Sequence, residues 1–293
     1  MTRFTLDDVR ERTYKQRDAW WTVFLVDPLA GRLVVATANR TSLTPNQLTV
    51  GAGLFGLGSA ICFAMATWPW LVAGALLFHL SFVLDCMDGK IARLKGTGTV
   101  FGAWVDFVFD RIRFFGCMLA LMIGQWLHTG EIVYLLLAPV ATFVDLLRYL
   151  NGPQMGKTRA TMRTRLAEAE ATGTVTVQDT DPEAIEAAPM AGDEGDEGDS
   201  AAQPAQSKGR LARMSAALRR HRVRMHLFSG IEFEMFVCVV APLTAVVSLF
   251  TPLDSLIVAV VVLSCAALLV FEAALVARLW AETRRFEKKI RTY

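Results

Sequence analysis

The stretch that decides the fold reads LDCMDGKIAR over residues 84–93 and GAWVDFVFDR over residues 102–111. Both halves lie in apolar segments, yet together they carry four aspartates: Asp85, Asp88, Asp106 and Asp110. An ionised carboxylate in or near hydrocarbon is costly, and four together repel each other unless cations lie between them. The stretch therefore predicts two membrane helices whose ends share a divalent metal site.

The composition of the whole chain agrees with a membrane protein. Of its 293 residues 53% are hydrophobic, and the charges gather at the two ends and in one central segment. Six apolar segments are each long enough to cross a bilayer. They cover residues 49–67, 70–92, 100–126, 131–150, 229–250 and 254–280. We predict an all-α integral membrane protein with six transmembrane helices.

The N-terminal segment, residues 1–48, is basic and carries Trp20 and Trp21, which suit the membrane–water interface. We predict that it forms an interfacial helix, and we expect no cleavable signal peptide. Lys and Arg gather in this segment, in the 93–99 turn, in the 151–228 loop and at the C-terminus. The positive-inside rule then predicts a multi-pass protein of the cell (inner) membrane, with both termini and the four aspartates on the cytoplasmic side.

The predicted domain plan follows from these segments. It has an N-terminal segment (1–48), helices one to four (49–150, with the aspartates at 85–110), a cytoplasmic loop (151–228), helices five and six (229–283) and a basic tail (284–293). Within the loop, residues 168–199 are acidic with few apolar side chains, which predicts disorder, as a linker or a regulatory segment. Residues 208–224 are basic and are expected to bind anionic membrane lipids, not nucleic acid.

The spacing of the aspartates indicates which metal they would bind. Asp85 and Asp88 are three residues apart and Asp106 and Asp110 are four apart, so on helices each pair shares one face. The 93–99 turn makes an antiparallel hairpin that brings both faces together. Such hard oxygen ligands favour Mg²⁺ or Mn²⁺, and zinc is not expected because no His or Cys other than Cys86 accompanies them.

Small and basic residues flank the aspartates. Gly89 and Gly102 would let a ligand approach the backbone closely, with tight helix packing as the alternative reason for them and for Ala92. Arg93 lies one turn beyond Gly89 and could grip a diphosphate. Two metal ions, an arginine and small residues together favour a site for a diphosphate ester.

The chain contains the pattern Asp85-x2-Asp88-Gly89-x2-Ala92-Arg93-x8-Gly102-x3-Asp106-x3-Asp110. This pattern resembles the motif of the class I CDP-alcohol phosphotransferases, also called CDP-alcohol phosphatidyltransferases. These are membrane enzymes of phospholipid biosynthesis. The resemblance implies metal ligation by Asp85, Asp88 and Asp106, while Asp110 would complete the second metal site and act as general base. It also implies that the CDP moiety is held by Gly89, Ala92 and Arg93, with Asn46, Thr49 and Thr99 as further nucleotide contacts.

The activity that this resemblance implies is metal-dependent transfer of a substituted phosphate group from a CDP-alcohol to an acceptor hydroxyl, with release of CMP. The simplest donor at a bilayer surface is CDP-diacylglycerol, and family acceptors include glycerol 3-phosphate, inositol phosphate and serine. A soluble CDP-alcohol donor or a lipid acceptor remains an alternative. Candidate ligands for an acceptor phosphate, each of which could instead bind lipid headgroups, are Arg111, Arg113, Arg148, Arg224 and His226. Glu232 and Glu234 could pair with Arg148 or bind a cationic headgroup, with an internal salt bridge as the alternative.

Two interpretations without enzymatic activity also remain open. A cation-coupled transporter would have acids spread across the bilayer depth, whereas here all four are expected at one side. A membrane scaffold would recruit partners through the charged 151–228 loop. The glycine-rich first span (Gly51, Gly53, Gly56, Gly58) suits either internal packing or a homodimer.

Overall fold

The computed structural model describes residues 3–172, 220–224, 228–250 and 255–291. Every long element among them is a helix, as predicted, and extended pairing is limited there to one bridge between Asp18 and Val223. Within these described residues, five helices are long and apolar enough to cross a membrane. They are α3 (Pro45–Ala64), α4 (Trp68–Lys95), α6 (Val133–Thr172), the segment Gly230–Leu249 and α11 (Ile257–Ile290). The chain is an all-α multi-pass membrane protein.

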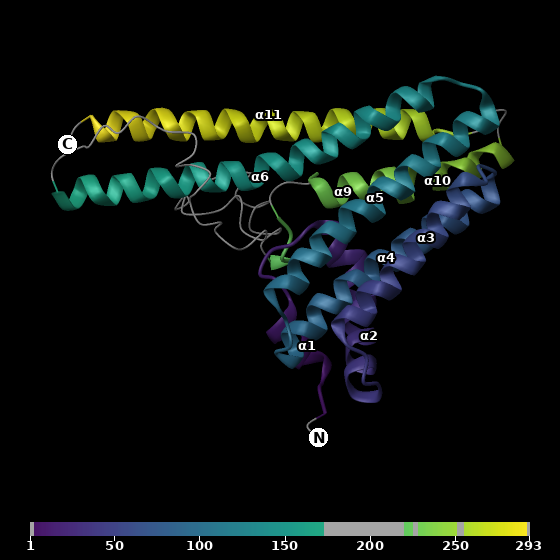
Figure 1. Ribbon diagram of the computed structural model, residues 1–293, viewed down its shortest axis with the longest axis horizontal. Coiled ribbons are helices and arrows are strands. Elements are labelled where there is room, and N and C mark those ends of the chain that lie inside the picture. Colours follow the sequence, from purple (N-terminus) through teal and green to yellow (C-terminus); the bar gives the residue numbers. More distant parts are fainter. Residues whose placement is uncertain (1–2, 173–219, 225–227, 251–254, 292–293) are drawn as a thin grey trace.

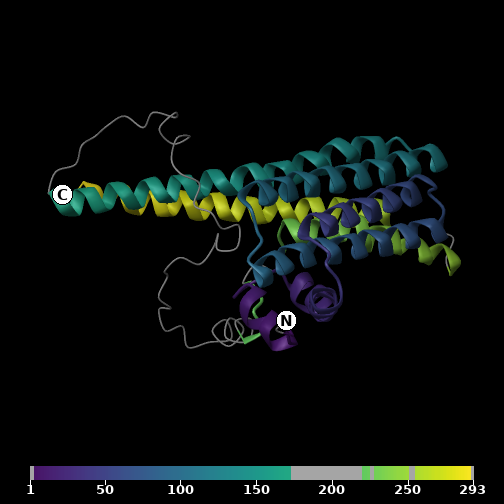
Figure 2. The same cartoon turned by 60° about the horizontal axis from the view of Figure 1, so that its bottom comes forward.

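The third predicted span, residues 100–126, corresponds to α5 (Val100–Thr129), which is not one of those five helices. Its first half carries Asp106, Asp110, Arg111 and Arg113, which lower the hydropathy of that half. Figures 1 and 2 show α5 beside α3 and α4 in the same bundle. It packs on α3 and is joined to α4 by the ion pair between Arg113 and Asp85. A count of six spans remains a prediction.

The N-terminal segment forms α1 (Leu6–Thr13), a π-helical turn η1 (Thr22–Val26) and α2 (Asp27–Arg40), so it holds two helices instead of the predicted single one. Both α1 and α2 contact α4 at one end of the bundle (Figure 2). A buried ion pair fastens them there, because Lys90 Nζ lies 3.1 Å from Asp27 Oδ1.

A short strap, residues 220–224, holds the N-terminal segment from the other side. Asp18 and the strap exchange backbone hydrogen bonds, from the Asp18 amide to the Arg222 carbonyl at 2.8 Å and from the Arg224 amide to the Asp18 carbonyl at 3.0 Å. The guanidinium of Arg222 also donates to the carbonyl of Lys15 at 2.8 Å and lies 4.5 Å from the centre of the Tyr14 ring. Two segments far apart in sequence are thereby joined.

The hairpin between α4 and α5 has local causes in the sequence. Gly96 ends α4 in the left-handed region, with φ of 65°, a conformation that costs glycine little. Thr99 begins α5 as its N-cap, because its hydroxyl accepts a hydrogen bond from the Gly102 amide at 3.0 Å. The turn is therefore short, and it brings the aspartates of both helices to the same end of the hairpin.

The sequence predicted a loop from residue 151, but the chain stays helical there because α6 continues to Thr172. The end of the fourth membrane span at residue 150 remains a prediction. Likewise α11 extends beyond the predicted end at residue 283, to Ile290. The two helices lie side by side beyond the bundle (Figures 1 and 2), joined by ion pairs of 2.9 Å between Arg159 and Glu282 and between Glu170 and Lys289. Each extension gives the other a packing partner. Most of the acidic stretch 168–199 and of the basic stretch 208–224 lies outside the described residues.

The fifth predicted span is helical but changes type along its length. It consists of α9 (Gly230–Met235), the π-helical η2 (Phe236–Val240), α10 (Ala241–Leu243) and the 3₁₀-helical η3 (Thr244–Leu249). The changes fall around Pro242, which has no amide hydrogen to continue a regular ladder.

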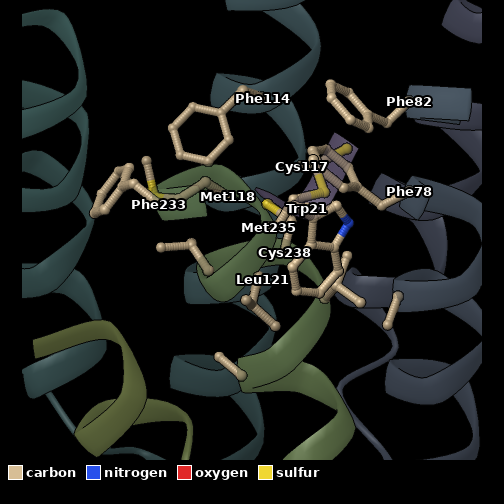
Figure 3. Close-up of a cluster of buried hydrophobic side chains, with 14 of the residues drawn as sticks. Trp21, Phe78, Phe82, Phe114, Cys117, Met118, Leu121, Phe233, Met235 and Cys238 are labelled. Carbon is tan, nitrogen blue, oxygen red and sulfur yellow. The ribbon is translucent and has the colours of Figure 1, made fainter. Parts of the chain in front are cut away.

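The hydrophobic core lies where this broken helix meets α4 and α5. Figure 3 shows Phe78 of α4, Phe114 of α5 and Phe233 of α9 gathered there with Trp21. The Phe114 and Phe233 rings pack edge to face, with centroids 5.9 Å apart. This packing fixes the relative position of the two helices that carry the aspartates.

Candidate metal centre

Three of the four predicted metal ligands converge. Asp85 and Asp88 of α4 and Asp106 of α5 each offer a carboxylate oxygen, and these oxygens all lie within 4.8 Å of one another. Asp88 is only 4% exposed. Three carboxylates this close repel each other strongly, and an all-oxygen donor set is the one that Mg²⁺ and Mn²⁺ prefer. The residues present therefore fit a hard divalent cation.

The fourth aspartate is joined to the cluster through an arginine. Arg113 donates to Asp110 Oδ1 at 2.6 Å and to Asp85 Oδ1 at 3.0 Å. The guanidinium of Arg113 thus bridges Asp110 to Asp85, one of the three clustered carboxylates. The sequence analysis missed this role of Arg113, although its position three residues after Asp110 places both on one face of α5.

Thr49 supports the metal cluster from α3. Its hydroxyl donates to Asp88 Oδ2 at 2.5 Å, so a residue predicted to contact the nucleotide in fact touches a predicted metal ligand. The start of α3 is fixed by a capping box between Thr44 and Gln47, with Pro45 in the first turn. Thr49 then follows Pro45 by one turn. Asn46 is exposed in that same first turn, and its nucleotide contact remains a prediction.

Arg93 lies against Gly89, the residue after Asp88, and its binding of the CDP moiety remains a prediction. A Cβ atom built on Gly89 would lie 3.6 Å from Arg93 Nη1, so the guanidinium folds back along α4 over Gly89. The half-buried Ala92 faces the turn, since its methyl carbon would lie 3.7 Å from a Cβ built on Gly98. An exposed arginine beside a glycine and next to Asp88 is a suitable place for a diphosphate.

Thr99 and Gly102 have a structural role that the sequence analysis did not predict. The hydroxyl of Thr99 caps α5, and a Cβ built on Gly102 would lie only 2.9 Å from that hydroxyl oxygen. A side chain at position 102 would therefore require the Thr99 hydroxyl to shift. Nucleotide binding by Thr99 remains a prediction.

Arg111, a candidate phosphate ligand, lies in a buried network. It forms ion pairs with Asp145 at 3.1 Å and with Glu234 at 2.8 Å. Its guanidinium lies 3.6 Å from the centre of the Tyr149 ring, and the Tyr149 hydroxyl donates to Glu234 at 2.8 Å. The network ties α5 to α6 and α9 directly beside Asp110.

The other candidate phosphate ligands are also paired with acids. Arg148 lies 3.4 Å from Glu272 and Arg224 lies 3.8 Å from Asp18, while His226 is outside the described residues. Glu234 forms an internal salt bridge, with Arg111, and Glu232 accepts a hydrogen bond from the hydroxyl of Ser229 at 2.6 Å. An acceptor phosphate would have to share these arginines with carboxylates.

Comparison with known proteins identifies the segment that carries this site. Residues 42–170 match the model of the CDP-alcohol phosphatidyltransferase family, a range that contains α3, α4, α5 and most of α6. This match to the family model agrees with the resemblance of the aspartate motif, which lies within the same segment.

Relatives with curated names are similar over a shorter stretch. The chain is 42% identical over 78 residues to a "Bifunctional IPC transferase and DIPP synthase" of Aquifex aeolicus, covering 27% of this chain and 17% of that protein. It is 34% identical over 88 residues to a "Phosphatidylinositol phosphate synthase" of Corynebacterium glutamicum, covering 30% and 37%. A protein of the same name from Mycolicibacterium smegmatis is 36% identical over 83 residues, covering 28% and 36%. The chain thus spans well under half the length of these relatives.

Proposed function

We propose that this protein is a CDP-alcohol phosphotransferase of phospholipid biosynthesis. It transfers a substituted phosphate group from a CDP-alcohol to the hydroxyl of an acceptor alcohol and releases CMP. The observation that carries the proposal is the convergence of Asp85, Asp88 and Asp106 within 4.8 Å, in a segment that matches the family model.

The residues of the site would have different roles in binding metal ions and the donor. Asp85, Asp88 and Asp106 would hold divalent ions, Mg²⁺ or Mn²⁺, and Asp110 would complete the site for the second of two ions. Bound metal supplies charge neutralisation of the diphosphate and polarisation of the phosphorus. Arg93, folded over Gly89, would bind the diphosphate of the donor and hold the charge of departing CMP.

Asp110 is the proposed general base. Arg113 occupies its Oδ1 atom, which leaves Oδ2 to accept the proton of the acceptor hydroxyl. The hydroxyl oxygen then forms a bond to the phosphorus that carries the alcohol, and the bond from that phosphorus to the CMP oxygen breaks. The proton remains on Asp110 until it passes to solvent.

We further propose CDP-diacylglycerol as the donor and a water-soluble acceptor. The site lies at the end of apolar helices, where a lipid headgroup and an aqueous molecule can meet. Because two of the matched relatives are named phosphatidylinositol phosphate synthases, a phosphorylated inositol is the first acceptor to test. By the positive-inside rule the site and both termini would face the cytoplasm. We propose separately that the protein forms a homodimer, since the small residues of α3 would allow two copies to pack closely.

The direct test is release of CMP by purified protein in detergent with Mg²⁺ and a panel of CDP-alcohols and acceptors. We expect release with at least one donor–acceptor pair, including CDP-diacylglycerol. Asp110→Asn should lose about 10²–10⁴-fold in turnover yet still bind the donor. Full activity of that variant would contradict the base assignment. No CMP with any pair would favour a transporter or scaffold.

A further inference from the structure

Arg113 lies where the two helices of the metal centre meet. Its guanidinium joins Asp85 of α4 to Asp110 of α5, taking one oxygen atom, Oδ1, from each. We propose that Arg113 is a built-in counter-ion of the metal centre, which positions both carboxylates and limits how strongly a divalent ion binds. This inference rests on the proposed function only in that the same aspartates hold the metal.

The burial of Arg113 distinguishes it from arginines whose charged groups extend to the membrane surface. Its side chain is 7% exposed, and its Nε atom is buried without a hydrogen-bond partner in the described part of the chain. A buried cation is costly unless it is paired, and here both pairing groups belong to the candidate metal centre. The position of Arg113 is therefore set by the aspartates and not by solvent or lipid headgroups.

The neighbouring helix has a groove for this side chain. A Cβ built on Gly56 of α3 would lie 2.7 Å from Arg113 Cγ and 3.0 Å from its Cδ. Contacts that close do not occur, so any larger residue at position 56 would displace the arginine stem. Gly53 lies on the same helix, and a Cβ there would have no neighbour within 4 Å. The two glycines therefore form a matched pair for a test.

The charge of Arg113 competes with that of a bound metal ion. Four ionised aspartates attract cations, and a guanidinium bonded to two of them removes part of that attraction. Loss of this charge should strengthen metal binding while it releases Asp110 from a fixed orientation. An arginine that served packing alone would give the opposite result, since its loss would loosen the ligands and weaken metal binding.

The experiment measures Mn²⁺ binding to the purified full-length protein in detergent, with free Mn²⁺ followed by electron paramagnetic resonance. Arg113→Gln should bind Mn²⁺ about tenfold more tightly than the wild type. Its turnover should fall about 10–100-fold, because Asp110 is no longer held. Arg113→Lys keeps the charge but lacks the two-pronged geometry, so it should keep wild-type Mn²⁺ affinity and lose turnover.

Gly56→Ala tests the same proposal with the arginine still present. It should tighten Mn²⁺ binding and reduce turnover by displacing the stem, whereas Gly53→Ala should match the wild type in both. Unchanged or weaker Mn²⁺ binding in folded Arg113→Gln, or in Gly56→Ala if the former does not fold, would overturn the proposal. Wild-type protein that releases no CMP but shows these Mn²⁺ shifts would contradict the proposed reaction and leave this inference standing.

Discussion

The hydroxyl of Thr49 on α3 donates to Asp88 Oδ2 on α4, across 39 residues of sequence. A hydrogen bond to one carboxylate oxygen fixes the orientation of the other, so Thr49 helps to aim a predicted metal ligand. The bond also connects the capped start of α3 to the metal centre.

Replacing Thr49 by Val removes this hydroxyl but keeps the shape of the side chain. We expect Thr49→Val to lower metal affinity or turnover about 10–100-fold, the usual effect of losing a group that orients a ligand. Thr49→Ser keeps the hydroxyl and should stay close to the wild type. The measurement is CMP release as a function of Mg²⁺ concentration. Equal curves for the Val variant and the wild type would show that Thr49 does not orient Asp88 for metal binding.

Removal of divalent metal should affect both activity and stability. We expect a chelator to abolish CMP release and Mg²⁺ to restore it. Ligand binding to the folded state stabilises by about 2.7 kcal/mol at one hundred times the dissociation constant, so Mg²⁺ should also raise the unfolding temperature. Asp106→Asn should lose this thermal shift. A shift that persists in Asp106→Asn would place the ion elsewhere.

Gly124 on α5 marks the closest approach of that helix to the end of α3. A Cβ built there would lie 2.6 Å from the backbone carbonyl oxygen of Phe63, which cannot rotate away. Gly124→Ala should therefore destabilise the protein by about 1–3 kcal/mol, measured by thermal unfolding in detergent. Gly116, on the same helix, has no neighbour within 4 Å of its Cβ position. Gly116→Ala should be neutral or slightly stabilising, and equal effects of the two would contradict the packing argument.

The Asp27–Lys90 pair attaches the N-terminal helices to α4, with side chains only 5% and 6% exposed. Replacing one partner leaves the other charge buried, at a cost of about 3–5 kcal/mol. Asp27→Asn should accordingly lower the unfolding temperature strongly. The double variant Asp27→Asn with Lys90→Met removes the stranded cation and should recover part of the loss. A double variant no better than the single one would show that Arg222, which also reaches Asp27, dominates this contact.

The aspartate cluster could be predicted from sequence because its geometry is local. Spacings of three and four residues put each pair on one helix face, and the turn after Gly96 keeps the hairpin short. The partners of the arginines could not be predicted in the same way. Arg111 meets Glu234 across 123 residues, and such a pairing depends on tertiary packing that no local spacing encodes.

The length of α6 shows the same limit. Asn151, Gly152 and Pro153 are typical of a helix end, and the sequence predicted a loop there. A proline within a helix removes a backbone hydrogen bond and crowds the carbonyl of the preceding turn. The helix nevertheless continues past Pro153, because α11 packs along it. Tertiary contact outweighed the local preference at this position.

The bond between Arg222 and the carbonyl of Lys15 spans 207 residues. A ribosome adds about 5–20 residues each second, so the beginning of the chain must wait roughly 10–40 seconds before its partner strap has been made. During that interval α3 to α6 have already been synthesised and can enter the bilayer. The contact between the N-terminal segment and the strap is thus expected to form late in biogenesis, which makes this contact a reporter of whether the nascent protein has finished assembling.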